Sequence, residues 1–178
     1  MSSFQQALLL LSIALHYLYS AEASAALVTC GSVIKLSHAR TSYLLHSHEI
    51  AYGSGSGQQS VTGYDSSDDA NSLWIIRGLK GHWCPQGSSI KSGFQLRLQH
   101  ASTRKFLHSH HFESPLSGQQ EVSAFGSDTD SDDMDIWQVD WDKGAGEWTQ
   151  DQQVRLRHAH TGVYLASGPQ RRGSWSIY

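Results

Sequence analysis

A six-residue pattern that occurs three times is the strongest constraint on the fold of this chain. The pattern is IKLSHA at 34–39, LRLQHA at 96–101 and VRLRHA at 154–159. Its histidines are spaced by about 60 residues, and a fixed period of this kind is typical of repeat architectures. We therefore expect three units of similar structure.

The first two units share further features beyond this pattern. These are HSH at 46–48 and 108–110, SGQQ at 56–59 and 117–120, and a closing tryptophan at Trp74 and Trp137. The repeats span about residues 28–80, 90–142 and 150–178, and the third contains neither HSH nor SGQQ. We therefore expect the third repeat to be truncated. Either the fold has an open seam, or this chain is an incomplete version of a longer protein, which is the interpretation we favour.

The order of residues within a repeat predicts β-strands. Aliphatic residues alternate with basic or polar ones in each copy of the pattern, as in a strand with one buried face. Turns rich in Gly and Ser, such as GSGSG at 53–57, separate the short strands. The sequence therefore predicts an all-β fold, a β-trefoil in which six strands close a barrel and three hairpins cap it. The tail at 168–175 predicts no second strand pair for the third unit.

The N-terminal segment predicts export. Residues 1–26 contain an apolar run at 7–15 followed by small residues, which is typical of a secretory signal peptide. A buried N-terminal helix is the alternative. The domain then occupies residues 27–178, in which no apolar stretch is long enough to cross a bilayer. The formal net charge of −3 excludes the strongly basic field that nucleic-acid binding needs.

The chain contains two cysteines, Cys30 and Cys84. In the oxidising compartment that an exported protein enters, we expect them to form a disulfide. The bond would close a loop of about 54 residues and stabilise the fold by about 3–4 kcal/mol in the chain-entropy model. Two cysteines alone do not make a structural zinc site.

Two long segments resemble a known family. LHSH at 45–48 with YGSGSGQQSVTG at 52–63, and LHSHH at 107–111 with SPLSGQQEV at 114–122, are similar to the MIR repeat of the stromal cell-derived factor 2 family. The chain departs from the family pattern where AS at 166–167 replaces a third HSH.

The resemblance implies a small protein of the endoplasmic-reticulum lumen with a three-repeat β-trefoil and no known catalysis. It also implies a role in protein folding and quality control, beside a lumenal heat-shock chaperone and its J-domain co-chaperone, with unfolded polypeptides as clients. The chain ends in SIY without a lumenal retrieval tetrapeptide, so localisation to the lumen or secretion are both expected. We expect no cofactor.

The paired histidines are the first candidate site. His46 and His48 are separated by one residue, as are His108 and His110, so each pair projects from one face of a strand. The favoured interpretation is architectural, with imidazoles that bridge strand ends to backbone carbonyls. A polar ligand pocket is the second interpretation. A metal site is the third, and it needs a further ligand such as Glu49, His111 or Glu113.

The glycine–glutamine pairs are the second candidate site. Gly57 and Gln58 correspond to Gly118 and Gln119, and both pairs follow Ser-rich turns. Their amides could bind sugar hydroxyls or an extended peptide backbone. The alternative is a turn that glycine makes possible and glutamine caps.

Catalysis has little support in the sequence. The acidic segment at 128–135 fails as a calcium loop, because Asp133 and Val139 stand where Gly and Glu are required. It predicts a solvated turn instead. No nucleophile elbow or phosphate loop is present. We therefore expect a non-enzymatic binding module, with a glycan-binding trefoil as the alternative and a metal-dependent hydrolase as the least favoured class.

Overall fold

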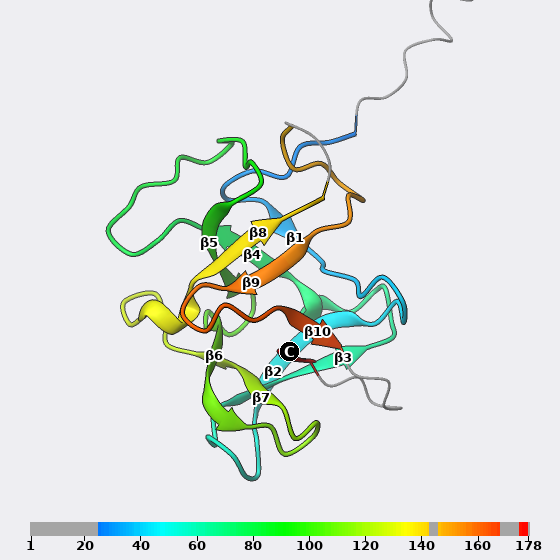
Figure 1. Cartoon of the computed structure of the whole chain (residues 1–178), viewed down its shortest axis with the longest axis vertical. Helices are drawn as coiled ribbons and strands as arrows, with labels where there is room; N and C mark the ends of the chain where they lie inside the picture. The colour runs from blue at the N-terminus through cyan, green and yellow to red at the C-terminus, as the bar shows by residue number, and fades with distance from the viewer. Residues whose placement is uncertain (1–24, 143–145, 168–174, 178) are drawn as a thin grey trace, which may run out of the picture.

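The fold is described from a computed structural model, which describes residues 25–142, 146–167 and 175–177 (Figure 1). For residues 175–177 only the backbone is described. The expected signal peptide at 1–26 therefore lies outside the described residues, except for its last two positions. In the described part the secondary structure is entirely strands and two short 3-10 helices, as the alternating pattern predicted.

The first two units contribute equivalent elements in the same order, and the third contributes a shorter set within the described residues. The first contains β1 (Val33–Ile34), β2 (Leu44–Ala51), β3 (Gln59–Tyr64), η1 (Ala70–Ser72) and β4 (Trp74–Arg77). The second contains β5 (Phe94–His100), β6 (Phe106–Glu113), β7 (Gln120–Phe125), η2 (Asp133–Asp135) and β8 (Trp137–Asp140). The third contains β9 (Arg155–His158), β10 (Leu165–Ser167) and β11 (Trp175–Ile177).

Five of these strands form the barrel. β4 pairs antiparallel with β1 and β5, and β8 pairs antiparallel with β5 and β9. Aliphatic residues are aligned across these pairs, as Ile76 is with Leu98 and Val139 with Leu156. Among the described residues no sixth strand lies between β9 and β1, so the described barrel has an open seam there, which both interpretations of the short third repeat accommodate.

Three hairpins accompany the barrel: β2–β3, β6–β7 and β10–β11. The β6–β7 hairpin lies in the lower part of Figure 1, beside the β2–β3 hairpin. The expectation that the tail contains no second strand pair is wrong, because Leu165 is aligned with Ile177. The reason is that β11 also pairs with β7, so the hairpin gains ladder hydrogen bonds from the second unit. The fold is a β-trefoil with all three hairpins and five barrel strands in the described residues.

The core lies inside the barrel and under the hairpins. The two closing tryptophans, Trp74 and Trp137, are fully buried. The indole N–H of Trp74 donates to the Leu45 carbonyl (2.8 Å), and that of Trp137 donates to the Leu107 carbonyl (2.9 Å). Each tryptophan thereby fixes its barrel strand to the hairpin of its own unit, and its buried N–H group is satisfied.

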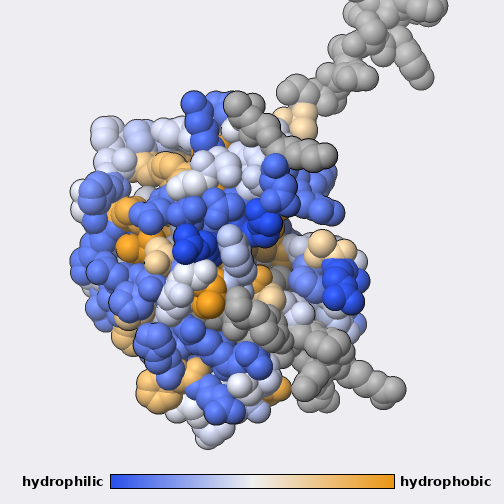
Figure 2. Space-filling view, viewed as in Figure 1, coloured by the Kyte–Doolittle hydropathy of each residue, from blue (hydrophilic) through white to orange (hydrophobic). Residues whose placement is uncertain are grey.

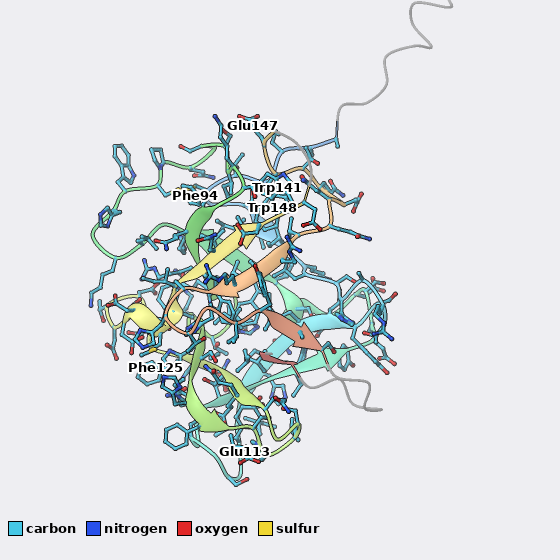
Figure 3. The ribbon with its side chains drawn as sticks, in the orientation of Figure 1. Phe94, Glu113, Phe125, Trp141, Glu147 and Trp148 are labelled. Atoms are coloured by element: carbon cyan, nitrogen blue, oxygen red, sulfur yellow. A yellow bond between two sulfur atoms is a disulfide. The ribbon has the colours of Figure 1, made fainter. Side chains whose placement is uncertain are left out.

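A disulfide and two tryptophans lie outside the strands. Cys30 is bonded to Cys84, with their Cα atoms 5.9 Å apart. Trp141 and Trp148 are labelled in the upper half of Figure 3; Trp148 belongs to the buried core, and Trp141 packs against that core. The face in Figure 2 is mostly hydrophilic, with small hydrophobic patches. Within the described residues, no helix is long and apolar enough to span a membrane.

Candidate functional site

The first histidine of each pair binds a carboxylate at the 3-10 helix that precedes the closing tryptophan. His46 Nδ1 lies 2.6 Å from Asp69 Oδ2, and Asp69 caps η1 by accepting from the Asn71 N–H and the Ser72 hydroxyl. Burial raises the pKa of Asp69, but these hydrogen bonds outweigh it and hold that pKa below its usual value. The first of these histidines therefore fastens β2 to the helix that precedes the closing tryptophan.

The second unit has a related but more buried arrangement, in which the carboxylate comes from the last residue of η2 rather than from its N-cap. His108 Nδ1 lies 3.0 Å from Asp135 Oδ1, and the Asp135 side chain is fully buried. Asp132 and Asp135 form a capping box around η2. This geometry favours the architectural interpretation of the histidines, although they bind carboxylates rather than the backbone carbonyls that we expected.

Backbone carbonyls are instead bound by the histidines of the repeated pattern. His100 Nε2 lies 2.9 Å from the Asn71 carbonyl, and His158 Nε2 lies 2.9 Å from the Met134 carbonyl. Burial lowers the pKa of both imidazoles, so both are neutral at pH 7. The sequence marked these histidines as repeat anchors but gave no indication of this bond.

The second histidine of each pair lies beside the first. The ring centroids of His46 and His48 are 5.2 Å apart, and those of His108 and His110 are 5.0 Å apart. This spacing fits a common strand face for each pair. His110 Nε2 also lies 3.2 Å from Glu121 Oε1, while burial lowers the pKa of His110.

Glu121 joins the first two units and was not anticipated. Its carboxylate is fully buried and accepts hydrogen bonds from the Ser56 backbone N–H (3.3 Å) and the Ser56 hydroxyl, in addition to His110. The first unit has Ser60 at the corresponding position. The sequence signal that could have identified Glu121 is therefore its departure from the repeat.

Tyr52 strengthens the same contact between units. Its hydroxyl lies 2.9 Å from the carbonyl oxygens of both Val61 and Val122, which belong to β3 and β7. Burial raises the pKa of Tyr52 to about 12. The hydroxyl therefore stays protonated and acts as a hydrogen-bond donor to these carbonyl oxygens. The turn of the first unit is therefore held against the second unit by two buried groups.

The glycine–glutamine pairs occupy two different environments. Gly57 and Gly118 have φ angles of 69° and 68°, a left-handed conformation that favours glycine and supports the turn interpretation. Gln58 is half-buried and accepts a hydrogen bond from the Ser123 hydroxyl (2.6 Å). Gln119 is exposed. Equivalent sequence positions therefore do not form equivalent sites.

A polar cleft of about 570 Å³ contains one of these pairs. Its walls come from the first two units: Glu49, Ala51, Gly57, Gln58, Gln59, Ser102, Thr103, Lys105 and Phe125. Gln59 Nε2 donates to the Thr103 hydroxyl across the unit boundary (2.9 Å). Phe125 and Glu113 lie in the lower half of Figure 3, and of these two only Phe125 lines the cleft. Gly57 and Gln58 are thus brought to the cleft, whereas Gly118 and Gln119 are not.

A possible metal cluster differs from the one that the sequence suggested. His108, Asp132 and Asp135 place ligand atoms within 4.8 Å of one another, whereas the further ligands considered from sequence were Glu49, His111 and Glu113. Asp135 already accepts from His108 and from the Asp132 N–H, and Asp132 Oδ1 accepts from the Met134 N–H. These oxygens therefore serve the capping of η2.

The hydrogen bonds of the buried carboxylates do not form a hydrolytic triad. A serine triad places the histidine between the nucleophile and the carboxylate. Here Glu121 lies between Ser56 and His110, so the imidazole cannot take a proton from that hydroxyl directly. The arrangement orients side chains and joins units, and it does not activate a nucleophile.

Comparison with known proteins assigns the class first. The MIR domain family model matches residues 27–176, which include all of the described strands and hairpins except Ile177. The chain is thus a β-trefoil of the MIR class. A solved structure of the SDF2-like protein from Arabidopsis thaliana is 46% identical, with a TM-score of 0.83 over 85% of this chain and 88% of that one.

Sequence relatives define the family. Stromal cell-derived factor 2-like protein 1 from Bos taurus is 49% identical over 167 residues, which are 93% of this chain and 74% of that protein. The chain belongs to the stromal cell-derived factor 2-like family of MIR-domain proteins, and members of this family are not known as enzymes. The fold is also similar to the Saccharomyces cerevisiae protein O-mannosyltransferase Pmt1–Pmt2 complex bound to the sugar donor. That match has 33% identity and a TM-score of 0.77, over 86% of this chain and 23% of that one.

Proposed function

We propose that this protein is a non-enzymatic component of a chaperone complex in the endoplasmic-reticulum lumen, where it acts in protein folding and quality control. It binds polypeptide clients or co-chaperones through its MIR β-trefoil. The observation that carries the proposal is membership of the stromal cell-derived factor 2-like family over residues 27–176. The proposed partners are a lumenal heat-shock chaperone and its J-domain co-chaperone.

Three features of the chain support this proposal. The apolar segment at 7–15 is typical of a signal peptide, which would direct the protein to the secretory pathway. The Cys30–Cys84 disulfide suits an oxidising compartment. The hydrogen bonds of Glu121 and His110 join units rather than activate a nucleophile, which fits a binding module better than an enzyme.

The experiment is a crosslinked pull-down of the tagged protein from secretory-pathway lumen, followed by mass spectrometry. We expect recovery of a lumenal heat-shock chaperone and a J-domain protein, and this recovery should be unaffected by deglycosylation. Recovery of glycoproteins alone, abolished by deglycosylation, would contradict the proposal.

A glycan-binding trefoil is the second candidate, and the polar cleft favours it. Gln58 and Gln59 line this cleft with amide groups suited to sugar hydroxyls. Retention on immobilised oligosaccharide, competed by free sugar, is the expected behaviour of a lectin. Gln58→Ala should weaken that retention, and Gln119→Ala is the matched control because Gln119 holds the equivalent position outside the cleft.

A further inference from the structure

Two exposed histidines from different units lie against each other. His111 belongs to β6 of the second unit, and His160 belongs to the turn between β9 and β10 of the third. Their ring centroids are 6.2 Å apart, with an angle of 64° between the ring planes. Both residues are exposed, so burial of apolar surface does not account for the contact. We call these two residues the boundary histidines.

The ring nitrogens of the boundary histidines distinguish them from the other histidines. Each of the others that the structure describes has a ring nitrogen in a hydrogen bond. For His111 and His160, no hydrogen bond of a ring nitrogen occurs within the described residues. An imidazole binds a metal ion through the lone pair of such a nitrogen. Both boundary histidines are therefore available as metal ligands.

The turn that contains His160 is held by backbone bonds to both units. The Ala159 N–H donates to the Ile136 carbonyl of the second unit (2.9 Å), and the Gly162 N–H donates to the His158 carbonyl (2.8 Å). Gly162 has a φ of 75°, a left-handed conformation that lets the turn close. His160 lies between these two bonds, so its backbone has a fixed position relative to β6.

His111 lies where the pairing of β6 is irregular. The register of β6 with β7 shifts between Ser109 and Glu113, and His111 is in the middle of this shift. Bulges of this kind re-aim side chains relative to a regular strand. His110 contacts the Glu121 carboxylate of its own unit, whereas His111 contacts the third unit. The two consecutive imidazoles therefore serve different units, and His111 takes no part in the buried network of His110.

The boundary between the first two units has its polar cleft at the corresponding place. Counted from the repeated motifs, Glu49 corresponds to His111, and Ser102 corresponds to His160. Glu49 and Ser102 both line the polar cleft, so the fold brings these two positions together at both boundaries. The first boundary has a carboxylate and a hydroxyl there, and the second has two imidazoles. The same place in the fold therefore has a different ligand set in each case.

The spacing of the boundary histidines suits a shared metal ion. In a zinc site each imidazole nitrogen lies about 2.0–2.1 Å from the ion, which places the centroids of two such rings roughly 5–6 Å apart. The observed 6.2 Å is close to this range, and both side chains are exposed. In the described part of the chain, the only group of three or more His, Cys, Asp or Glu ligands is His108, Asp132 and Asp135. Water must therefore complete the coordination at the boundary histidines.

Imidazole ligands select the kind of ion. Neutral imidazole suits the divalent ions of zinc, copper and nickel, whereas calcium and magnesium prefer oxygen ligands. The affinity of a nitrogen site for first-row ions rises to Cu²⁺ and falls again at Zn²⁺. Two imidazoles with water therefore favour a transition-metal ion, and Cu²⁺ should bind more tightly than Zn²⁺.

We propose that His111 and His160 together bind one divalent transition-metal ion, Zn²⁺ or Cu²⁺, at the boundary of the second and third units. The ion joins β6 to the turn after β9 and adds a link between these two units. This inference goes beyond the proposed function and does not depend on it, because metal binding needs no partner protein. The site is also separate from His108, Asp132 and Asp135, whose hydrogen bonds serve the capping of η2.

Isothermal titration calorimetry of the untagged protein with ZnCl₂ tests the site. We expect one ion per chain and at least about tenfold weaker binding by His111→Gln and by His160→Gln, because each variant loses the effective concentration of the second imidazole. The double variant should bind about as weakly as either single variant, since the two side chains act as one site. His82→Gln is the control, because His82 is exposed and its ring is hydrogen-bonded to the Lys80 carbonyl.

Thermal melts give a second readout of the same site. An ion that binds the folded state alone raises the melting temperature. Zn²⁺ should therefore raise the melting temperature of the unchanged protein and of His82→Gln, and should leave that of His111→Gln and His160→Gln nearly unchanged. Circular dichroism without metal checks that the variants are folded, which we expect because both substitutions are at exposed positions.

Two results would overturn the proposal. The first is equal Zn²⁺ affinity of the unchanged protein and the folded variants of His111 and His160, with an equal rise in melting temperature. The second is a loss of binding in His82→Gln as large as in those variants, because it would show dispersed binding by surface histidines. If one of the two boundary variants does not fold, the other decides by the same comparison with His82→Gln.

Discussion

The closed side of the barrel and its open seam are built from the same repeated pattern, yet they bury it to different extents. Leu96 and Leu98 of β5 lie between β4 and β8, and both have no exposed surface. Ile34 and Leu36, their counterparts beside the seam, are half-buried. An alternating pattern therefore sets which face of a strand points inward, while the neighbouring strands decide how much of that face is removed from water.

Removal of the disulfide should cause the largest loss of stability, and the strand beside the seam should lose more than the strand on the closed side. Cys30 lies just before β1, so the bond fastens one wall of the seam to the loop after β4. The Cys30→Ser/Cys84→Ser double variant is expected to lose about 3–4 kcal/mol of unfolding free energy, because a long loop of the unfolded chain is no longer closed. Urea denaturation measures the loss. Hydrogen exchange should show that β1 loses more protection than β5, and equal losses would contradict this reasoning.

The leucines at equivalent positions give the next largest effect. Leu98→Ala should cost about 3 kcal/mol, because a fully buried side chain leaves a cavity, and Leu36→Ala about half as much. Chemical denaturation of the two variants gives the difference directly. If both substitutions cost the same, the seam is not a site of reduced burial.

Histidines on the closed sides of the barrel should contribute more to the loss of stability in acid than the histidine beside the seam. Burial lowers the pKa of His100 and His158, so the unfolded state binds more protons and stability falls as the pH drops below about 6.5. His100→Gln should flatten the stability profile between about pH 7 and 5. His38→Gln, at the half-exposed position beside the seam, should flatten it less. A steeper dependence on His38 would reverse the comparison.

An exposed ion pair beside β5 should give the smallest effect. Hydrogen bonds from Arg104 and Gln99 hold the pKa of Asp128 at about 2. Its contribution is therefore complete above its unfolded pKa of about 3.9 and is lost as the pH falls through about 2. Asp128→Asn should change the melting temperature little at neutral pH, where salt screens an exposed pair. It should reduce the fall in melting temperature at acid pH. Asp130→Asn, in the same turn, serves as the control.

The repeat predicted the fold because each unit carries the same strand and turn signals. The pattern around His38, His100 and His158 placed the barrel strands, and the closing tryptophans placed β4 and β8. The pairing of β10 with β11 was missed because ladder bonds are made by the backbone, and β7 supplied a partner from another unit that no local signal encodes.

The candidate site was predicted in part, and its misses share a cause. The histidine pairs lie on strands, as their spacing indicated, but the carboxylate partners Asp69 and Asp135 lie at 3-10 helices more than twenty residues away in the sequence. The two glycine–glutamine pairs look alike in sequence, and only one faces a cleft because the other has a different neighbouring unit. Single-sequence patterns identify positions within a unit and not the contacts between units.

Glu121 has a consequence for how such a molecule can diverge after duplication. A unit that carries this carboxylate depends on a serine from the turn of the unit before it, and on its own His110. Exchanging the first and second units, or building a trefoil from identical copies of either one, would remove a partner or multiply a buried charge. The first two units are therefore not interchangeable, because the buried carboxylate of one requires a hydroxyl that the turn of the other supplies.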